Sequence, residues 1–350
     1  MKTSLKKSLT EQQVEASAPC RIDAGGTWDI KAFALPFEAL EPTTVNAALN
    51  LRTTVTLRPF DDGYIRILSD GFPEGRIQTL NEGSFDPPFG LFFAALSHFQ
   101  VHGVEIYIRS SSPVKSALGG SSTALVALLK ALGKALALEG RKAMGPRDIL
   151  FLAYHLEDAI SGGNCGLQDQ AAAVYGGVHQ WNWRHGHARS PFKSIRLLDR
   201  RGQKAFSERL LVAYSGEAHV SHNTNRKWIR DFLSGKTRSG WIQANHVVHG
   251  LARALQEKDW SRCALLLQEE MGLRKKITPE ALIPVSEKLI GQAEGLGCGA
   301  RFTGAGAGGC LWAVGRKKDV VRLSCLWEET LSGIPGGALL HCGVDPAGVK

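Results

Sequence analysis

Apolar and polar residues alternate in three segments of the first third of the chain, residues 53–60, 64–70 and 104–110. A period of two is typical of strands with one buried face, so each segment is predicted to be a strand. A proline-marked stretch at residues 85–99 predicts a short helix between the second and third strands. Residues 1–18 are polar, and we expect them to be mobile.

The next segment, residues 121–138, has the pattern of a helix that is apolar almost all round. Lys130 and Lys134 are its charged residues, four positions apart on one edge. Such a helix lies buried between layers, and its apolar run is too short to span a bilayer. A second helix is predicted to begin at Pro146, where the first helical turn tolerates proline, and to end near Ile160.

The second half begins after a polar, proline-containing stretch at residues 184–194. A strand is predicted at residues 209–216, helices between about 223 and 297, and late strands at 299–314 and 336–344. Strands and helices mix without regular alternation, which indicates an α+β fold in two lobes. We place the lobes at residues 1–200 and 201–350.

Composition narrows the class of protein. Hydrophobic residues make up 43% and charged residues 21%, as in an ordinary globular enzyme. The formal net charge of +9 suits nucleic acid, an anionic membrane or phosphorylated small molecules, and a solvated positive face is the plainer alternative. No nucleic-acid module is found, so we expect neither a nucleic-acid nor a membrane partner. Seven scattered cysteines without a CxxC pair, and no secretory signal, predict a reduced, cytoplasmic protein. Oligomeric state stays open.

The helix at 121–138 follows an unusual loop, "SALGGSS", residues 116–122. The first turn of a buried helix carries unpaired N–H groups and a partial positive charge. Glycines there let the backbone approach a phosphate, and serine hydroxyls add donors or a magnesium ligand. It is not a P-loop, because no G-x-x-x-x-G-K-[ST] occurs in the chain. The alternative is a plain serine N-cap after a glycine turn.

Two carboxylates follow. Glu157 has apolar or aromatic helical neighbours, so its carboxylate is predicted to face the packed side, whereas Asp158 is free to face solvent. An inward Glu157 needs a metal, a basic partner or the rim of a cleft; a structural salt bridge is the plainer alternative. Asp169 stands at a predicted helix start, as a simple acidic first-turn residue or as a general base in phosphoryl transfer.

Two further glycine turns complete the pattern. In "RIDAGGTWD", Arg21 and Asp29 flank a Gly-Gly turn, which suits a polyhydroxylated ligand. Residues 304–309 satisfy GxGxxG, but "CLWAV" behind them is typical of a strand. A dinucleotide site would need a helix after Gly309, so we predict a backbone-lined loop near the active site instead.

Taken in order, these glycine-rich segments resemble the GHMP kinase superfamily, named for galactokinase, homoserine kinase, mevalonate kinase and phosphomevalonate kinase. Residues 113–123, "PVKSALGGSST", match its phosphate-binding motif P-x-x-x-G-L-G-S-S-A, with departures at Ala117 and Gly120. "RIDAGGTWD", "VNAALNL" and "GLQDQAAAVYGG" are most similar to the heptose 7-phosphate kinase and L-fucose kinase branch.

The resemblance implies an N-terminal lobe of the ribosomal protein S5 domain 2-like fold and a C-terminal lobe of ferredoxin-like type. It implies ATP and Mg²⁺ as cofactors, with Glu157 and Ser121 as magnesium ligands. Ser121 aligns best with the serine of the motif, and Ser122 is the alternative. Asp169 would be the base, and Arg21 would polarise the accepting hydroxyl. The ATP phosphates would rest on Ala117, Leu118, Gly119, Gly120, Ser121 and Ser122. The residues lining the acceptor would be Gly26, Asp29, Gly304 and Gly306.

We therefore expect an ATP-dependent sugar kinase acting on a hydroxyl, the anomeric one, of a monosaccharide or a sugar phosphate such as heptose 7-phosphate or L-fucose. The alternative is a catalytically silent member of the fold that binds a sugar or nucleotide. Further candidates for acceptor contacts are Lys115, His219, His222, Arg226 and Lys227.

Overall fold

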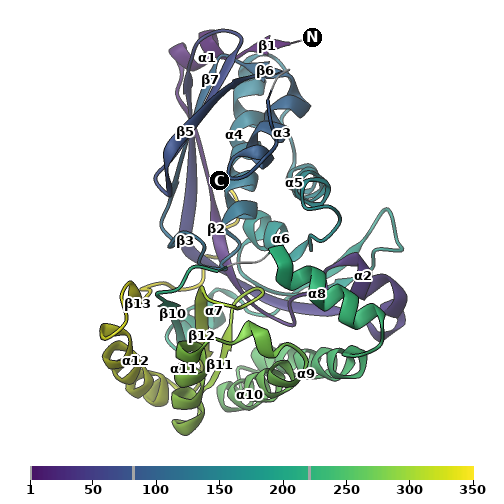
Figure 1. Cartoon of the computed structure of the whole chain (residues 1–350), viewed down its shortest axis with the longest axis vertical. Coiled ribbons are helices and arrows are strands. Elements are labelled where there is room, and N and C mark those ends of the chain that lie inside the picture. Colours follow the sequence, from purple (N-terminus) through teal and green to yellow (C-terminus); the bar gives the residue numbers. More distant parts are fainter. Residues whose placement is uncertain (1, 81–82, 220–221) are drawn as a thin grey trace.

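The two larger β-sheets lie one after the other along the long axis of the molecule (Figure 1). The computed structural model describes residues 2–350 except 81–82 and 220–221. The strands of the seven-stranded sheet all come from residues 14–196, and those of the four-stranded sheet from residues 210–339. Helices pack on both, which gives the α+β fold in two lobes that the sequence predicts.

The seven-stranded sheet has the order β5-β4-β7-β3-β8-β9, with β2 paired to β3. β4 and β7 are parallel, and the other pairs are antiparallel. The three alternating segments form parts of β3, β4 and β7, as predicted. The strands are β2 (Val14–Ala24), β3 (Thr43–Pro59), β4 (Tyr64–Ser69), β5 (Phe72–Thr79), β7 (Val104–Ser110), β8 (Val178–Trp183) and β9 (Phe192–Arg196).

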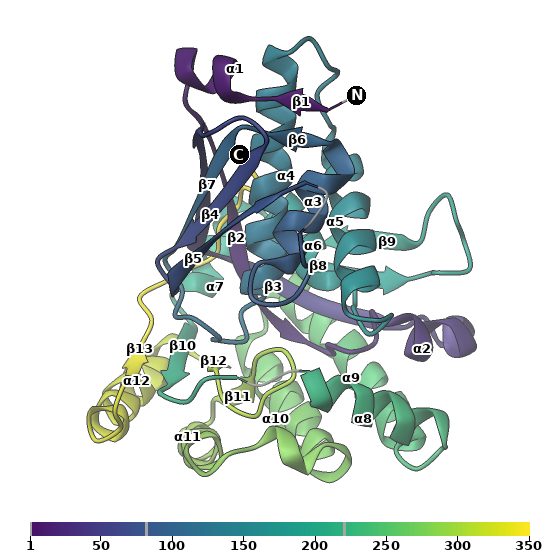
Figure 2. The ribbon, with the colours of Figure 1, turned by 45° about the horizontal axis from the view of Figure 1, so that its top comes forward.

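One face of this sheet carries the helices of the first lobe (Figure 2). They are α3 (Gly90–Phe99), α4 (Gly120–Leu138), α5 (Pro146–Ile160) and α6 (Gln168–Tyr175). By length and composition α4 could cross a membrane, but 72% of its most apolar window is buried inside the fold. It is the core helix that its nearly all-apolar circumference predicts.

The prediction of a mobile N-terminus is wrong for the residues described. β1 (Thr3–Ser4) pairs in parallel with β6 (Val101–His102). α1 (Lys6–Glu11) follows, and Leu5 and Leu9 are buried in the core. These two leucines are four positions apart and lie on one side of a helical turn, where they bury apolar surface. The mostly polar composition of residues 1–18 gave no sign of this contact.

The second lobe has the strand order β11-β12-β10-β13, with antiparallel pairings throughout. Helices separate β10 from β11 and β12 from β13, so the chain order is the β-α-β-β-α-β of a ferredoxin-like domain, as the resemblance implied. The strands are β10 (Leu210–Ser215), β11 (Gly299–Phe302), β12 (Cys310–Val314) and β13 (Gly337–Leu339).

Aromatic packing joins the two lobes. Trp28 and Phe33 of the first lobe contact Phe232 and Trp241 of the second, with the Phe33 and Phe232 rings stacked at 4.1 Å between centroids. The remaining helical elements are α2 (Lys31–Ala34), η1 (Leu35–Leu40), α7 (Arg200–Ser207), α8 (His222–Leu233), α9 (Arg238–Glu257), α10 (Trp260–Ile277), η2 (Pro279–Ala281), α11 (Pro284–Gly295) and α12 (Lys317–Ser332).

The last residues of the chain return to the first lobe. Val344 forms a bridge with Leu49, and Lys350 exchanges two backbone hydrogen bonds with Ser17 on β2. The division near residue 200 stays a prediction, since the tail of the second segment packs on the first sheet.

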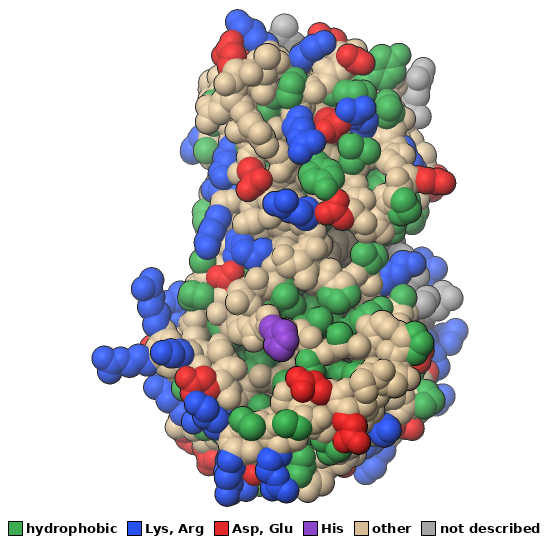
Figure 3. Space-filling model, turned by 90° about the vertical axis from the view of Figure 1, so that its left-hand side faces the viewer, with side chains coloured by type: hydrophobic (Ala, Val, Ile, Leu, Met, Phe, Trp, Pro, Cys, Tyr) green, Lys and Arg blue, Asp and Glu red, His purple; other side chains and the backbone are tan. Residues whose placement is uncertain are grey.

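Basic side chains do not gather into one surface on the face drawn in Figure 3. There Lys and Arg are interspersed with Asp, Glu and hydrophobic side chains. The positive net charge is therefore distributed over this face and marks no single binding site on it.

Replacing a core leucine of α4 tests the packing of the first lobe. Leu128 is fully buried. We expect Leu128→Ala to lower the free energy of unfolding by about 2–5 kcal/mol, because transfer and cavity terms add. Lys130→Ala on the rim of the same helix is the control. The free energy of unfolding of both variants is measured by urea denaturation. If Leu128→Ala lowers it no more than Lys130→Ala does, the described packing of α4 is contradicted.

Candidate active site

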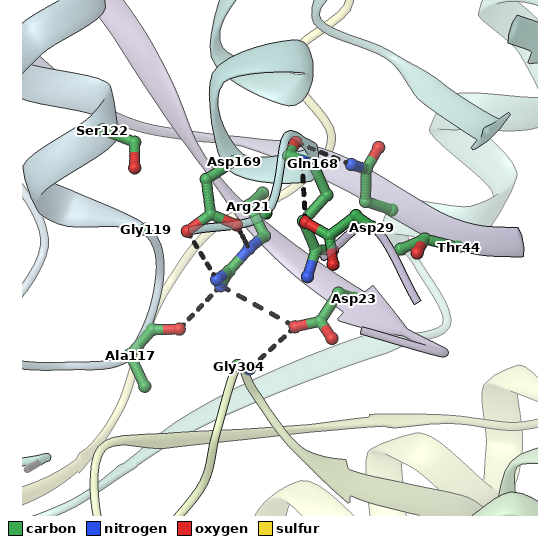
Figure 4. A network of polar contacts seen from close by, with 12 residues as sticks. Arg21, Asp23, Asp29, Thr44, Ala117, Gly119, Ser122, Gln168, Asp169 and Gly304 are labelled. Atoms are coloured by element: carbon green, nitrogen blue, oxygen red, sulfur yellow. Dashed lines mark hydrogen bonds and ion pairs between the residues drawn. The ribbon is translucent and has the colours of Figure 1, made fainter. Parts of the chain in front are cut away.

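Four separate segments meet where the two lobes join (Figure 4). Arg21 comes from β2 and Asp169 from the first turn of α6. Ala117 lies in the loop before α4, and Gly304 in the loop between β11 and β12. The fold therefore brings together three glycine-rich segments and a carboxylate that are far apart in the sequence.

Asp169 and Arg21 form a two-point ion pair. The guanidinium donates from Nε to Oδ1 at 2.7 Å and from Nη2 to Oδ2 at 2.9 Å. Burial opposes the charge on Arg21, but the carboxylates of Asp169 and Asp23 outweigh it and raise the pKa of Arg21. Arg21 therefore stays cationic, and the planar pair fixes the Asp169 carboxylate in one orientation. The Asp169 side chain keeps 24% of its surface exposed and accessible to a ligand.

Gly119 brings the loop before α4 against this carboxylate. A Cβ atom built on Gly119 would lie 3.1 Å from Oδ2 of Asp169, and the residue has φ of 77°. Both the close approach and the left-handed backbone favour glycine. A larger residue at this position would push the loop away from Asp169.

The loop turns its carbonyl groups inward. The carbonyl of Ala117 accepts from Arg21 Nη1 at 2.6 Å, and that of Leu118 accepts from the Arg21 backbone at 3.1 Å. The first N–H of α4 with an acceptor is that of Thr123. Those of residues 120–122 have none among the described residues. Free N–H groups at the start of a buried helix are suited to bind an anion.

Ser121 and Ser122 both donate to Glu157. Ser121 Oγ lies 2.9 Å from Oε1 and Ser122 Oγ 2.6 Å from Oε2, while Gln170 Nε2 donates to Oε2 at 2.6 Å. The plain serine cap is wrong, because the N-cap is Gly119 and no side chain caps the helix. The structural salt bridge is wrong as well, because Glu157 has no basic partner among the described residues.

This group of oxygens fits a magnesium ion. Burial raises the pKa of Glu157, and hydrogen bonds from Ser122 and Ser121 oppose that rise. Hydroxyl and carboxylate oxygens are the ligands that Mg²⁺ prefers, with its other positions filled by phosphate oxygens and water. Ser121 is exposed, whereas Ser122 is 3% exposed. The exposed hydroxyl of Ser121 is thus the one that a nucleotide can reach, and its role as a ligand stays a prediction.

Asp158 was expected to be free to face solvent, but the structure largely buries it. Its side chain is 15% exposed, pairs with Lys31 at 3.1 Å, and accepts from the Cys165 backbone at 3.3 Å. The glycine-rich turn after α5 folds back over the carboxylate, a tertiary contact that helical geometry alone does not reveal.

Asp29 ties the Gly-Gly turn to the start of α6. It is 3% exposed, and its oxygens accept from the backbone of Thr27 at 3.1 Å and of Gln168 at 3.0 Å. Burial raises the pKa of Asp29 to about 6. A Cβ on Gly26 would lie 2.4 Å from Oδ2 of Asp23, so this turn is closely packed as well. The sugar-binding roles of Asp29 and Gly26 stay predictions.

The third glycine-rich loop is followed by a strand, β12, as predicted, which excludes the dinucleotide reading. Gly304 reaches the site, since its N–H donates to Asp23 at 2.8 Å. Gly306 instead packs against Ala281, whose carbonyl would lie 2.4 Å from an added Cβ. Of the two glycines of this loop that were predicted to line the acceptor, Gly304 is therefore the one that lies beside Arg21.

Sequence reasoning missed three buried side chains of the site, Asp23, Gln170 and Arg301. Asp23 follows Arg21 by two positions on the same strand, and this period of two could have placed both on one face. Gln170 follows Asp169 and was visible in "GLQDQ". Arg301 had no local signal, because its partners Asp23 and Glu270 come from other elements.

The further candidates for acceptor contacts lie in different environments. Lys227 is neutralised by Asp231 and Glu280 at 2.9 Å each. The His219 ring contacts the Gly306 carbonyl, and Lys115 is exposed. Arg226 is exposed on α8, with Nη2 3.9 Å from a Cβ built on Gly162. The side chain of His222 lies outside the described residues.

Comparisons with known proteins agree with this architecture. Residues 90–177 match the GHMP kinases N terminal domain, and residues 251–326 match the GHMP kinases C terminal domain. A mevalonate kinase of Thermococcus sibiricus is 22% identical over 88% of this chain and 90% of its own. A D-glycero-alpha-D-manno-heptose 7-phosphate kinase of Campylobacter jejuni is 29% identical over 47% of this chain and 49% of its own.

Among solved structures, the galactokinase of Lactococcus lactis complexed with galactose superposes with a TM-score of 0.75 at 16% identity, covering 99% of this chain and 98% of its own. The N-terminal and C-terminal domain matches, the order of the motifs and the fold all agree with the GHMP kinase superfamily. The protein is a phosphotransferase that uses ATP, and a heptose phosphate kinase stands among its relatives, as the resemblance implied.

Replacing Ala117 by the glycine of the motif tests the strain in the loop before α4. Ala117 has φ of 60°, a left-handed conformation that costs a residue with a Cβ atom about 1–2 kcal/mol. We expect Ala117→Gly to raise the free energy of unfolding by about 0.5–1 kcal/mol, after the larger unfolded-state entropy of glycine is subtracted.

Ala137→Gly is the matched control, because Ala137 is exposed within α4. There the same substitution is expected to cost about 1 kcal/mol. Denaturant unfolding of both variants decides, and equal losses would show that the loop at Ala117 is unstrained.

Proposed function

We propose that this protein is a sugar kinase that transfers the γ-phosphate of ATP to a hydroxyl, the anomeric one, of a monosaccharide or a sugar phosphate. The observation that carries the proposal is the contact between Gly119 and Asp169. It sets a carboxylate, fixed by Arg21, directly against an anion-binding helix start. Phosphoryl transfer needs these two parts side by side.

The phosphates would bind at the start of α4. The free N–H groups of residues 120–122 and the helix dipole favour the negative charge of a triphosphate. Ser121 and Glu157 would hold Mg²⁺, which when bound neutralises charge on the transferred phosphoryl group. Gln170 keeps the Glu157 carboxylate turned toward the serines.

Asp169 would act as the general base. As the acceptor oxygen attacks the γ-phosphorus, its proton passes to the Asp169 carboxylate, the new O–P bond forms, and the bond to the β-phosphate oxygen breaks to release ADP. Arg21 holds both carboxylate oxygens in place and remains charged throughout. Asp29, which lies beside the start of α6, would accept hydrogen bonds from hydroxyls of the sugar ring.

The class of acceptor rests on the turn "RIDAGGTWD" and on the "GLQDQ" segment, which are most similar to heptose and fucose kinases. Relatives of this chain are named for mevalonate, galactose and heptose 7-phosphate, which all offer a hydroxyl but differ in charge and size. A sugar ring offers several hydroxyl groups as donors to the buried carboxylate of Asp29, whereas an acyclic alcohol offers fewer.

Removing the base tests the proposal. We expect Asp169→Asn to lower kcat by about 10²–10⁴-fold, the usual contribution of a positioned general base, with nucleotide affinity unchanged. The assay is ADP release on fucose, mannose, galactose and heptose 7-phosphate, with ATP affinity measured by calorimetry. An active Asp169→Asn variant would refute the base. A wild-type protein that binds sugar and ATP without releasing ADP would favour the silent binding module.

Arg226 offers a test of acceptor charge. It has no ion-pair or hydrogen-bond partner among the described residues. It lies near Gly162, in the turn that precedes Gln168, and the backbone of Gln168 donates to Asp29. We expect Arg226→Gln to raise KM about tenfold for a phosphorylated acceptor, the value of a charge-assisted hydrogen bond, and to leave KM for its neutral counterpart unchanged.

Arg230→Gln, an exposed substitution one turn further along α8, is the control. Equal KM values for Arg226→Gln and Arg230→Gln on the phosphorylated acceptor would remove Arg226 from acceptor recognition.

A further inference from the structure

Several buried charged side chains lie behind the reacting groups and take no part in the mechanism above. The side chains of Asp23, Glu270 and Arg301 are completely inaccessible, and Arg274 is fully buried as well. Burying a charge is expensive unless it is paired, so four such groups in one place require an explanation.

Three of them continue the ion pair of the base into an unbroken chain. Arg21 Nη1 lies 3.7 Å from Asp23 Oδ1, and Asp23 Oδ2 lies 3.1 Å from Arg301 Nη1. Arg301 Nε in turn donates to Glu270 Oε2 at 2.9 Å. Acidic and basic side chains therefore alternate from Asp169 to Glu270, and Figure 4 shows the part of this chain around Arg21 and Asp23.

This series of ion pairs crosses from one lobe to the other. Asp23 belongs to β2 of the first sheet, whereas Arg301 and Glu270 belong to β11 and α10 of the second lobe. Asp23 also accepts the N–H of Gly304, so the third glycine-rich loop is anchored at the same carboxylate. The second lobe thus reaches the base through Asp23.

Arg274 is a further buried cation, close enough to this series of ion pairs for its pKa to respond to the charge of Arg301. Its guanidinium lies 4.6 Å and 4.3 Å from the ring centroids of Trp228 and Trp241, and no carboxylate pairs with it among the described residues. Burial, and next the charge of Arg301, lower the pKa of Arg274 to about 9. The positive charge of Arg301 thus disfavours a second positive charge on Arg274.

This arrangement is a poor way to gain stability. Three of its polar atoms are buried without a hydrogen-bond partner in the described part of the molecule: Nη2 of Arg301, Oε1 of Glu270 and Nη2 of Arg274. Each orphaned polar group costs free energy, and apolar side chains of similar volume often stabilise such a site as well or better. What an ionic chain provides that an apolar core cannot is a fixed direction for each carboxylate and guanidinium.

We propose that Arg301 is a positioning residue for the base. By holding Asp23, it keeps Arg21 shared between two carboxylates and so sets the orientation of Asp169 from the second lobe. The inference rests on the proposed function for its kinetic consequence, but its structural consequence, ordering of the segments around Arg21 and Asp169, is independent of it.

The test compares Arg301→Met and Arg301→Lys with a matched control, Arg52→Met. Arg52 also makes a largely buried ion pair, with Asp345 of the C-terminal tail, but it has no contact with the chain to Asp169. Two readouts are taken on the full-length protein, steady-state kinetics with the accepted sugar and hydrogen–deuterium exchange without ligand.

For Arg301→Met we expect kcat to fall about 10–100-fold, the usual effect of removing a supporting partner, with KM for ATP unchanged. Exchange should become faster in residues 21–29 and 167–171. Arg301→Lys should lie between, because an ammonium cannot serve two carboxylates as a guanidinium fork does. Arg52→Met should lower the melting temperature without changing kcat or exchange at these segments.

An Arg301→Met protein with wild-type kcat and wild-type exchange in both segments would overturn the inference. Should Arg301→Met fail to fold, Arg301→Lys takes its place, and wild-type kcat together with wild-type exchange in that variant overturns the inference equally. A wild-type protein that phosphorylates no acceptor would refute the proposed function alone, because the exchange comparison still decides the role of Arg301.

Discussion

The site depends on one ion pair, in which the guanidinium of Arg21 grips both oxygens of Asp169 while its third nitrogen holds the loop carbonyl of Ala117. This one side chain fixes the distance between the carboxylate and the start of α4. Gly119 permits the approach, since any Cβ there would meet Asp169. Without the pair, no other contact among the described residues would hold the Asp169 carboxylate in this orientation beside the start of α4.

The two lobes contribute differently to this arrangement. The first supplies the strand of Arg21, the helix α4 and the carboxylates of Glu157 and Asp169. The second supplies a buried ionic brace through Arg301, together with the aromatic contacts of Phe232. Relatives of this chain are named as kinases of mevalonate, galactose and heptose 7-phosphate.

Local signals predicted what depends on local physics. Period-two segments became strands, the all-apolar segment became the buried helix α4, and the inward face of Glu157 led to the serine hydroxyls. The prediction failed where distant segments decide the outcome. Leu5 and Leu9 order the N-terminus by packing on the core, and the turn after α5 buries Asp158. Arg301 was invisible for the same reason, since its partners lie on other elements.

The most direct test is a crystal structure with magnesium and a non-hydrolysable ATP analogue. The account predicts the triphosphate on the N–H groups of residues 120–122, the metal between Glu157 and Ser121, and the terminal phosphate facing the carboxylate of Asp169. A triphosphate bound elsewhere, for example on the loop at 304–309, with Asp169 turned from it, would contradict the account.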